Sequence, residues 1–365
     1  MASNVRKKVV VAMSGGVDSS VAAALLIEAG YDIIGITLKT CQYENIYNRK
    51  TCCSPDHIND ARTVASKLGF PHQVIDVSEK FEQLVIDYFV DEYLAGRTPN
   101  PCVVCNPGVK WSELIRKADE LDAEFIATGH YARIRLDQTL NRYVLSKGKD
   151  ESKDQSYALW GLDQKLLGRT LFPLAELTKH EVRALAAKFE LFPATKDESF
   201  EICFIPDDDY ARFLREKVKG LKERVDDGEV VIDGKVVGRH EGYPFYTIGQ
   251  RRGLGISSAA PLYVISIDPQ NNRIILGGEG ELLHRGLMAS HVNTIKYEKI
   301  REPKRLSGKI RYKDPGSMAV VRTSENGSLE VLFDEPKRAM TPGQSIVLYE
   351  GDDVVGGGII DRIIP

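Results

Sequence analysis

The sequence predicts an α/β domain built on a parallel β-sheet, followed by a small central domain and a C-terminal β-barrel. Three observations lead to this prediction. Apolar strand-like runs alternate with helical stretches over the first ~140 residues, a helix-rich segment follows, and short β runs separated by turn residues fill the rest. With 365 residues, the chain is too long for one ordinary core. We expect domains at 1–165, 166–275 and 276–365, with a softer boundary near 206.

The first domain is predicted from apolar runs and helix stops. Strands are expected at 8–13, 31–38, 73–77 and 124–128, and helices at 19–29, 60–68, 81–94 and 111–121. The helices that end at Gly30 and Gly69 carry the usual stop signal. Strands that alternate with helices form a parallel sheet covered on both faces, and such sheets bind ligands beyond the carboxyl ends of their strands.

The pattern of apolar and turn residues changes in the rest of the chain. Helices are expected at 180–189 and 208–217, in the linker that carries Cys203. From Gly228 onward, short runs such as EVVI, PLYVISI, RIILGG and MAVVRT are separated by Gly, Asn and Asp-Pro. Short strands with regular turn signals are typical of a β-barrel or a β-sandwich.

Composition excludes several classes of protein. Hydrophobic residues make up 42% and charged residues 28%, as in soluble globular proteins. No apolar run approaches the ~18 residues of a membrane helix, and the N-terminal apolar run is too short for a signal peptide. We therefore expect a cytoplasmic protein with no membrane partner. The net charge of −3 shows no global basic excess, so contact with nucleic acid would depend on local patches.

The sharpest local signal is the loop Ser14–Ser20, SGGVDSS, between the first strand and the first helix. Gly15 and Gly16 can adopt positive φ, so that consecutive N–H groups point inward and form a nest for an anion. The helix N-terminus adds its dipole to this site. The loop lacks Gly-Lys-Ser/Thr and GxGxxG, which excludes a Walker loop and a dinucleotide fingerprint.

The six cysteines all lie within the first 203 residues. Clustered thiols in a reducing compartment are more often catalytic or metal-binding than structural disulfides. Cys102 and Cys105 form a C-x-x-C after two prolines, and Cys203 follows in an apolar setting that is also typical of a core position. A closed zinc site is disfavoured because no second ligand pair follows.

Basic residues near aromatic ones suggest an RNA surface or an ordinary charged one. Arg239 and Arg251-Arg252 lie close in sequence to Tyr243, Phe245 and Tyr246. Aromatic rings can stack on unpaired bases and Arg can pair with phosphates. Composition alone leaves both interpretations open.

The glycine loop resembles the SGGxDS signature of the PP-loop ATP pyrophosphatases, which cleave ATP between the α- and β-phosphates and adenylate a substrate oxygen. Further motifs follow along the chain: Cys52-Cys53-Ser54 with Asp60-Ala61-Arg62, GRTPNPC with CN, ATGHYAR (127–133), KDQSY (153–157), EICFI (201–205), FYTIGQRRGLG (245–255) and DEPKRAMTPGQS (334–345). Together they are similar, nearly end to end, to the bacterial tRNA-specific 2-thiouridylases (MnmA/TrmU family). The resemblance implies an ATP-dependent tRNA-uridine 2-sulfurtransferase acting on the wobble uridine of Glu-, Gln- and Lys-type tRNAs, with Mg²⁺-ATP and a sulfur-donor protein or sulfide source.

The resemblance also implies roles for individual residues. It assigns Cys105 as nucleophile and Cys203 as the carrier of a persulfide. It assigns ATP binding to Ala12, Met13, Ser14, Gly15, Gly16, Val17, Asp18, Ser19, Leu38 and Gly129. It assigns the target base to Asn100, Pro101 and Cys102. It assigns tRNA contacts to His130, Lys153, Asp154, Gln155, Arg311, Tyr312 and Gln344.

Cys102 departs from the family, which usually has Asp there. A thiol cannot simply inherit an acid's role, since its unperturbed pKa is ~8.5 against ~3.9. With Cys105 and Cys203 it matches the three-thiolate pattern by which related sulfurtransferases hold a [4Fe–4S] cluster. Two mechanisms follow: a Cys203 persulfide resolved by Cys105 as a disulfide, or attack by sulfide held on such a cluster. Cys102 favours the second.

Two other classes of function remain open. Another PP-loop adenylating ligase or amidotransferase would need no thiols. A non-enzymatic RNA-binding module with iron–sulfur or zinc would not release pyrophosphate. No role is assigned to Cys41, Cys52 or Cys53.

Overall fold

The computed structural model describes residues 6–40, 55–191 and 202–364, and Cys41, Cys52 and Cys53 lie outside them. The chain begins with a five-stranded sheet in the order β3-β2-β1-β4-β7, in which all neighbours are parallel. Its strands are β1 (Lys8–Ala12), β2 (Asp32–Lys39), β3 (His72–Asp76), β4 (Phe125–Ala127) and β7 (Thr170–Leu171). Because the order reverses at β1, the crevice between β1 and β4 is where such a sheet binds ligands.

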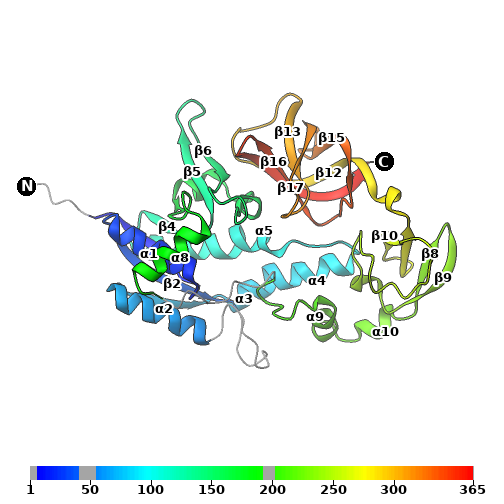
Figure 1. Ribbon diagram of the computed structural model, residues 1–365, viewed down its shortest axis with the longest axis horizontal. Helices are drawn as coiled ribbons and strands as arrows, with labels where there is room; N and C mark the ends of the chain where they lie inside the picture. Colours follow the sequence, from blue (N-terminus) through cyan, green and yellow to red (C-terminus); the bar gives the residue numbers. More distant parts are fainter. Residues whose placement is uncertain (1–5, 41–54, 192–201, 365) are drawn as a thin grey trace, which may run out of the picture.

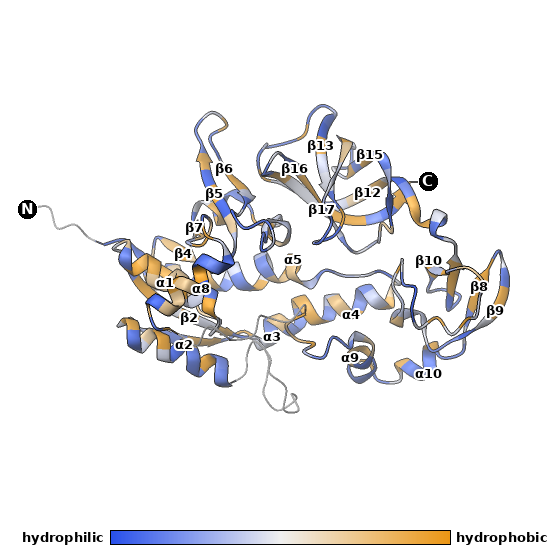
Figure 2. Ribbon diagram, in the orientation of Figure 1, coloured by the Kyte–Doolittle hydropathy of each residue, from blue (hydrophilic) through white to orange (hydrophobic). Residues whose placement is uncertain are grey.

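Both faces of this sheet are buried, as the sequence predicts. Val9 and Val11 pack with α1 and α8 on one face, whereas Val10 packs with α6 on the other. The helices around the sheet are α1 (Val17–Glu28), α2 (Pro55–Leu68), α6 (Ser112–Glu120) and α8 (Lys179–Lys188). In Figure 2, α1 is hydrophobic along most of its length, consistent with a helix pressed between the sheet and α8.

A nearly continuous helical path leads away from β3. It comprises α3 (Ser78–Phe81), the π-helical η2 (Glu82–Ile86) and α4 (Asp87–Leu94), and then, after a short connection, α5 (Pro101–Cys105) and the π-helical η3 (Asn106–Trp111), which continues into α6. Figure 1 shows α4 extending from the parallel sheet toward the small sheet formed by β8 to β11. The helix expected from residue 111 therefore starts ten positions earlier, at Pro101, because proline suits the first helical position.

An antiparallel hairpin that the sequence pattern did not predict follows β4. Its strands are β5 (Ala132–Asp137) and β6 (Arg142–Lys147). The short elements η4 (Ser156–Leu159) and α7 (Gln164–Gly168) then lead to β7. In Figure 1 the hairpin stands beside the barrel strands, and β6 pairs with β17 through Ser146 and Asp353.

The central part contains two helices and a four-stranded sheet. The helices are α9 (Tyr210–Lys217) and α10 (Leu221–Val225), and the strands are β8 (Gly228–Ile232), β9 (Lys235–His240), β10 (Tyr263–Asp268) and β11 (Arg273–Gly277). The order is β10-β11-β8-β9, with β11 and β8 parallel. The helix expected at 208–217 is confirmed, and Asp209 caps it by accepting from the Arg212 N–H.

The last part is a closed six-stranded barrel, which confirms the predicted fold class. After η5 (Tyr243–Phe245) and η6 (Glu279–Leu282), its strands are β12 (Leu283–Thr294), β13 (Lys304–Lys309), β14 (Ser317–Thr323), β15 (Leu329–Arg338), β16 (Ser345–Glu350) and β17 (Asp353–Ile364). The order is β12-β15-β14-β13-β16-β17, and pairing of β12 with β17 closes it.

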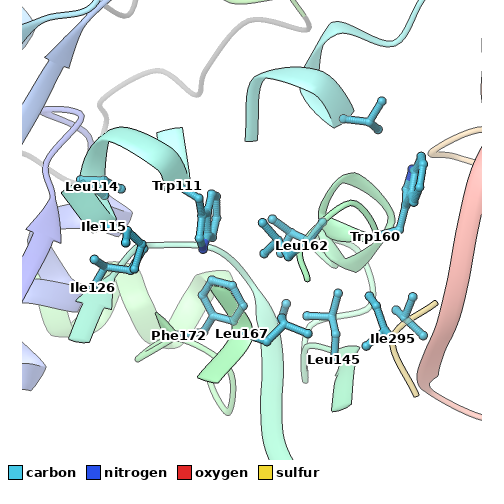
Figure 3. Packing of buried hydrophobic residues seen from close by; sticks show 14 of the residues in the cluster. Trp111, Leu114, Ile115, Ile126, Leu145, Trp160, Leu162, Leu167, Phe172 and Ile295 are labelled. Atoms are coloured by element: carbon cyan, nitrogen blue, oxygen red, sulfur yellow. The ribbon is translucent and has the colours of Figure 1, made fainter. Parts of the chain in front are cut away.

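One hydrophobic cluster joins the parallel sheet to the barrel. It contains Val10 and Ile126 from the sheet, Trp111 from η3, and Val347 and Tyr349 from β16. Figure 3 shows its middle, where Trp111 and Phe172 lie near Leu162 and Leu167, with Trp160 and Ile295 further along. Within the described residues, no helix has the length and apolar character needed to cross a membrane.

Candidate functional site

The loop after β1 adopts the positive φ expected of its glycines at Gly15 alone, since Gly16 has φ −92°. Gly15 has φ +72°, a conformation that side chains disfavour, and a Cβ there would lie 2.1 Å from the His57 carbonyl oxygen. The Ser19 hydroxyl braces the loop by donating to the Gly16 carbonyl at 3.0 Å and accepting from the Ser14 N–H at 3.2 Å. Gly16 is the N-cap of α1 and supplies no side-chain cap. The first amides of α1 therefore suit an anion.

The end of β4 closes the other side of this nest. A Cβ on Gly129 would lie 2.8 Å from the Asp18 carbonyl carbon and the Ser19 nitrogen, so only glycine permits this approach. Met13 is buried, and its carbonyl oxygen accepts a hydrogen bond from the Thr37 hydroxyl at 2.7 Å. Leu38, at the end of β2, packs on both clusters that meet at this edge of the sheet. Of the predicted nucleotide residues, Gly129 thus lies against Asp18 and Ser19, and Leu38 lies on the neighbouring strand β2.

Asp18 has two partners from distant parts of the chain. Lys179, the first residue of α8, donates from Nζ to both Asp18 carboxylate oxygens at 2.7 Å. The Tyr131 hydroxyl donates to Oδ1 at 2.8 Å. Lys179 is absent from the predicted site because no motif marks a lysine 161 positions away. A lysine beside the nest adds a positive charge where a triphosphate would lie.

Cys102 and Cys105 lie on the short helix α5, directly after Asn100. Asn100 is its N-cap, and Pro101 occupies its first turn and is buried. Cys105 is buried among Phe89, Val109 and other members of an apolar cluster, whereas Cys102 is exposed. One turn of helix therefore presents two thiols in different environments.

Aromatic packing fixes the segment that carries Cys203. Phe204 lies edge-on to Phe81 and Phe89, at centroid distances of 5.7 and 5.3 Å. Ile205 is fully buried, and Cys203 packs against the apolar cluster that contains Cys105. Residues almost a hundred positions apart, Cys105 and Cys203, thus share one cluster with Leu38.

Charges around Cys102 affect its ionisation. The protein atoms packed around its thiol raise the pKa above the ordinary value, although the residue keeps exposed surface. The charge of Lys110 lowers the pKa, and Cys203 raises it. Both groups therefore lie close enough to act on Cys102 electrostatically.

The three cysteines do not fit a cluster site in this arrangement. Over residues 6–40, 55–191 and 202–364, no group of three or more His, Cys, Asp or Glu side chains is placed to hold a metal ion. Cys102, Cys105 and Cys203 are all described, and so they do not present the three-thiolate set that a [4Fe–4S] cluster would need.

His130 lies beside the nest and is neutral. Its Nδ1 is 2.7 Å from the Thr128 hydroxyl, and its ring lies 5.5 Å from that of Trp111. Burial, and secondarily the charge of Lys110, lower the pKa of His130 to about 3. At neutral pH its imidazole can donate or accept a hydrogen bond but carries no charge to pair with phosphate.

The candidate tRNA residues at 153–155 differ in placement. Asp154 is buried and accepts from the Gly148 N–H at 3.3 Å and from the Ser156 N–H at 3.1 Å. Gln155 accepts from the Tyr131 N–H through Oε1 at 3.0 Å, whereas Lys153 is half-buried. Asp154 therefore supports the loop that presents Lys153.

The candidate tRNA residues of the C-terminal barrel lie close to residues of the first domain. Arg311 and Tyr312 are exposed, and the Tyr312 ring lies 6.3 Å from that of Tyr157. Gln344 donates from Nε2 to the carbonyl oxygens of Thr98 and Pro99, both at 3.1 Å. The structure thus places Gln344 against the segment before Asn100.

The aromatic residues near Arg251 and Arg252 are not placed for stacking on RNA bases. Tyr243, Phe245 and Tyr246 are buried in the cluster that includes Cys105. The two arginines themselves are exposed. The closeness of these rings to arginines in the sequence therefore does not indicate a base-stacking surface, because the rings pack in a hydrophobic core.

Family models cover most of the chain. The tRNA methyl transferase HUP domain matches residues 7–207, the tRNA methyl transferase PRC-barrel domain matches 213–278, and the aminomethyltransferase beta-barrel domain matches 284–360. Despite these descriptions, the similar curated proteins are named as thiouridylases.

Three of these relatives match over almost their full length. Proteins named tRNA-specific 2-thiouridylase MnmA from Salinibacter ruber and Cytophaga hutchinsonii are 52% and 51% identical, over 98% and 97% of this chain and 94% and 97% of theirs. The protein of that name from Amoebophilus asiaticus is 52% identical over 97% of this chain and 95% of its own. With the nest, the crevice and the paired cysteine segments in place, the chain belongs to the tRNA-specific 2-thiouridylase family.

Proposed function

We propose that this protein is an ATP-dependent tRNA-uridine 2-sulfurtransferase that converts the wobble uridine of a tRNA to 2-thiouridine. The observation that carries the proposal is the shared cluster that joins Leu38, at the end of β2, to Cys105 and Cys203. Leu38 lies in β2, which pairs with β1 directly before the nest, so a nucleotide held there would have its α-phosphate near the cysteine segments. Family membership supports the same substrate and product.

The nest would bind the phosphates of ATP, with Mg²⁺ as the accompanying ion and Asp18 as the carboxylate at that position. The uracil O2 attacks the α-phosphorus, pyrophosphate departs, and the oxygen becomes part of an adenylate. Activation is required because a carbonyl oxygen is a poor leaving group, whereas AMP is a good one. Backbone amides of residues 15–19 and the α1 dipole would stabilise the departing pyrophosphate.

Sulfur transfer follows through a persulfide on Cys203, loaded by a sulfur-donor protein. Its terminal sulfur attacks C2 of the adenylated base and AMP leaves with the oxygen. The Cys105 thiolate then attacks the Cys203 sulfur, which breaks the S–S bond to the base and releases 2-thiouridine. The transferred sulfur gains two electrons, and Cys105 and Cys203 become a disulfide. A thiol reductant restores both cysteines before the next turnover.

This route is proposed in preference to cluster-bound sulfide because the described cysteines form no three-ligand group. Cys102, which lies beside Asn100 and Pro101, would then help shape the pocket for the target base. The region of the half-buried Lys153 and the exposed Arg311 and Tyr312 would receive the anticodon arm, whose wobble base can be splayed out of its single-stranded loop.

The test is to supply an unmodified tRNA transcript of the Glu, Gln or Lys type with ATP and a persulfide donor. The products 2-thiouridine, AMP and pyrophosphate should form in equal amounts. Cys105→Ser and Cys203→Ser should abolish thiolation, whereas Cys102→Ser should retain much of it. Thiolation that requires protein-bound iron and is lost in Cys102→Ser would replace the persulfide route by the cluster route. Release of AMP and pyrophosphate that continues without Cys105 and Cys203, with no 2-thiouridine formed even by the wild type, would favour a PP-loop ligase.

A further inference from the structure

The connection between α4 and α5 is a junction of all three parts of the protein. We call residues 94–100 the junction segment. It follows α4, on which Tyr88, Phe89 and Tyr93 lie, and ends at the N-cap of the helix that carries Cys102 and Cys105. The N–H groups of residues 95–97 bond back to α4, whereas the Thr98 N–H and the carbonyl oxygens of Leu94, Thr98 and Pro99 bond to residues distant in sequence.

The central part contacts the start of this segment. The Tyr243 hydroxyl donates to the Leu94 carbonyl oxygen at 2.7 Å. Gly96 has φ +71°, and a Cβ there would lie 2.6 Å from Cγ of Pro269 and 3.1 Å from Ile267. The turn after β10 therefore packs directly against the backbone of Gly96.

The barrel contacts the rest of it. The Thr98 N–H donates to the Pro342 carbonyl at 2.9 Å, and Gln344 donates to the carbonyl oxygens of Thr98 and Pro99. Gly343 has φ +92°, and a Cβ there would lie 2.7 Å from the Thr98 oxygen. The turn between β15 and β16 is thus fitted closely to the junction segment.

Arg97, in the middle of the junction segment, joins α4 to the barrel. Its Nε donates to Glu92 of α4 at 2.9 Å, and its Nη2 donates to the Ile360 carbonyl of β17 at 3.3 Å. The Asp361 carboxylate forms an ion pair with the same guanidinium, with Nη2 and Oδ1 3.6 Å apart. The Arg97 side chain is only 24% exposed. A planar guanidinium that bonds to two elements fixes both distance and orientation, which a flexible ammonium does not.

We propose that Arg97 is a positioning residue, which fixes the barrel to α4 and so couples the barrel, together with the central part that contacts the same segment at Leu94, to the placement of Cys102 and Cys105. The coupling is rigid because Pro99 and Pro101 restrict the backbone on either side of Asn100. RNA that docks on the barrel and the central part would thereby bias the segment that presents the cysteines to the base. This inference rests on the proposed function for its catalytic readout.

The experiment compares Arg97→Met and Gly343→Ala with Arg116→Met. Arg116 is a matched control because it is an exposed arginine that pairs with Glu113 and Glu120 of its own helix. Amide hydrogen exchange of residues 95–105 is measured with and without a tRNA transcript. Thiolation kcat and the KM for ATP are measured on the same samples, after circular dichroism has confirmed folding.

Both junction variants should exchange faster over residues 98–105 and lose the protection that tRNA confers on the wild type. Their kcat should fall by about tenfold to about a hundredfold, as expected for misplaced reacting groups. The KM for ATP should stay within about twofold, since the nest is untouched. Arg116→Met should behave as the wild type.

Arg97→Met with wild-type exchange, or with faster exchange but wild-type kcat, overturns the inference. A wild type that forms no 2-thiouridine defeats the proposed function instead, while the exchange comparison still reports on the junction.

Discussion

Lys179 and Asp18 form a two-pronged ion pair in which the lysine Nζ lies 2.7 Å from each carboxylate oxygen. The pair joins the start of α8 to the start of α1, beside the proposed phosphate nest. Without the lysine, the Asp18 carboxylate beside the triphosphate would lose the ammonium group that both of its oxygens contact. The pair therefore sets the charge that an incoming nucleotide meets.

Replacement of Lys179 by Met should weaken ATP binding. We expect the KM for ATP in pyrophosphate release to rise by about tenfold, equivalent to about 1.4 kcal/mol. Lys188→Met is the control on the same helix, since Lys188 is exposed and lies 3.9 Å from Glu28. Equal KM values for the two variants would contradict a role for Lys179 at the nucleotide.

Gly15→Ala should abolish ATP binding, whereas Gly30→Ala should not. Both glycines have positive φ, at +72° and +84°, so both substitutions strain the backbone by roughly 1–2 kcal/mol. Only at Gly15 would the new Cβ also collide with the His57 carbonyl, while nothing lies within 4 Å of a Cβ on Gly30. Isothermal titration with a non-hydrolysable ATP analogue and thermal unfolding separate the two effects. Retained ATP affinity in Gly15→Ala would show that the nest does not hold the phosphates.

Cys102 should react slowly with iodoacetamide at pH 7 despite its exposure. The protein atoms packed around its thiol raise the pKa of Cys102, although the residue keeps exposed surface. The thiolate is the reactive form, and at pH 7 a smaller fraction of Cys102 than of a free cysteine is ionised. Mass spectrometry of the peptide that contains Cys102, across pH 7–10, gives the midpoint. Lys110→Met should move it higher still, because Lys110 lowers the pKa of this thiol. A midpoint in the variant at or below that of the wild type would contradict the placement of Lys110.

His130 should make the protein less stable as pH falls from 6.5 toward 3. The pKa of His130 in the folded chain is about 3, below the ordinary 6.5, so between these values the unfolded chain binds a proton that the folded chain does not. Its contribution to the free energy of unfolding is complete above pH 6.5 and falls through that window. Urea unfolding at pH 7 and pH 5 should therefore show a smaller difference for His130→Asn than for the wild type. An unchanged difference would contradict a neutral His130.

Local patterns predicted the first unit well. β1 and the loop after it follow from an apolar run that meets two glycines, and α1 ends where Gly30 predicts. The hairpin β5–β6 was missed although Ala132–Asp137 alternates apolar and charged residues, the pattern of a half-buried strand, because this stretch overlaps the end of the ATGHYAR motif. Its strand character depends on pairing between its own two strands and with the barrel.

The candidate site was predictable in its residue types more than in its contacts. The sequence marks Cys105 and Cys203, but the aromatic packing of Phe204 against Phe81 and Phe89 is what brings their segments together. Partners such as Lys179 for Asp18 and Pro342 for Thr98 connect residues that no local pattern relates. Such pairings depend on tertiary packing, which a single sequence does not display.

The continuous cluster from the parallel sheet to the barrel bears on how this chain can be divided. Trp160 donates to the Ser345 hydroxyl at 3.1 Å, and Tyr157 donates to the Ser345 carbonyl at 2.8 Å, both buried. A truncation that ends before β12 would remove the acceptors of these two hydrogen bonds and expose the hydrophobic surface that the barrel now covers. The nucleotide-binding half is therefore not a detachable module, and an expressed fragment of it should aggregate.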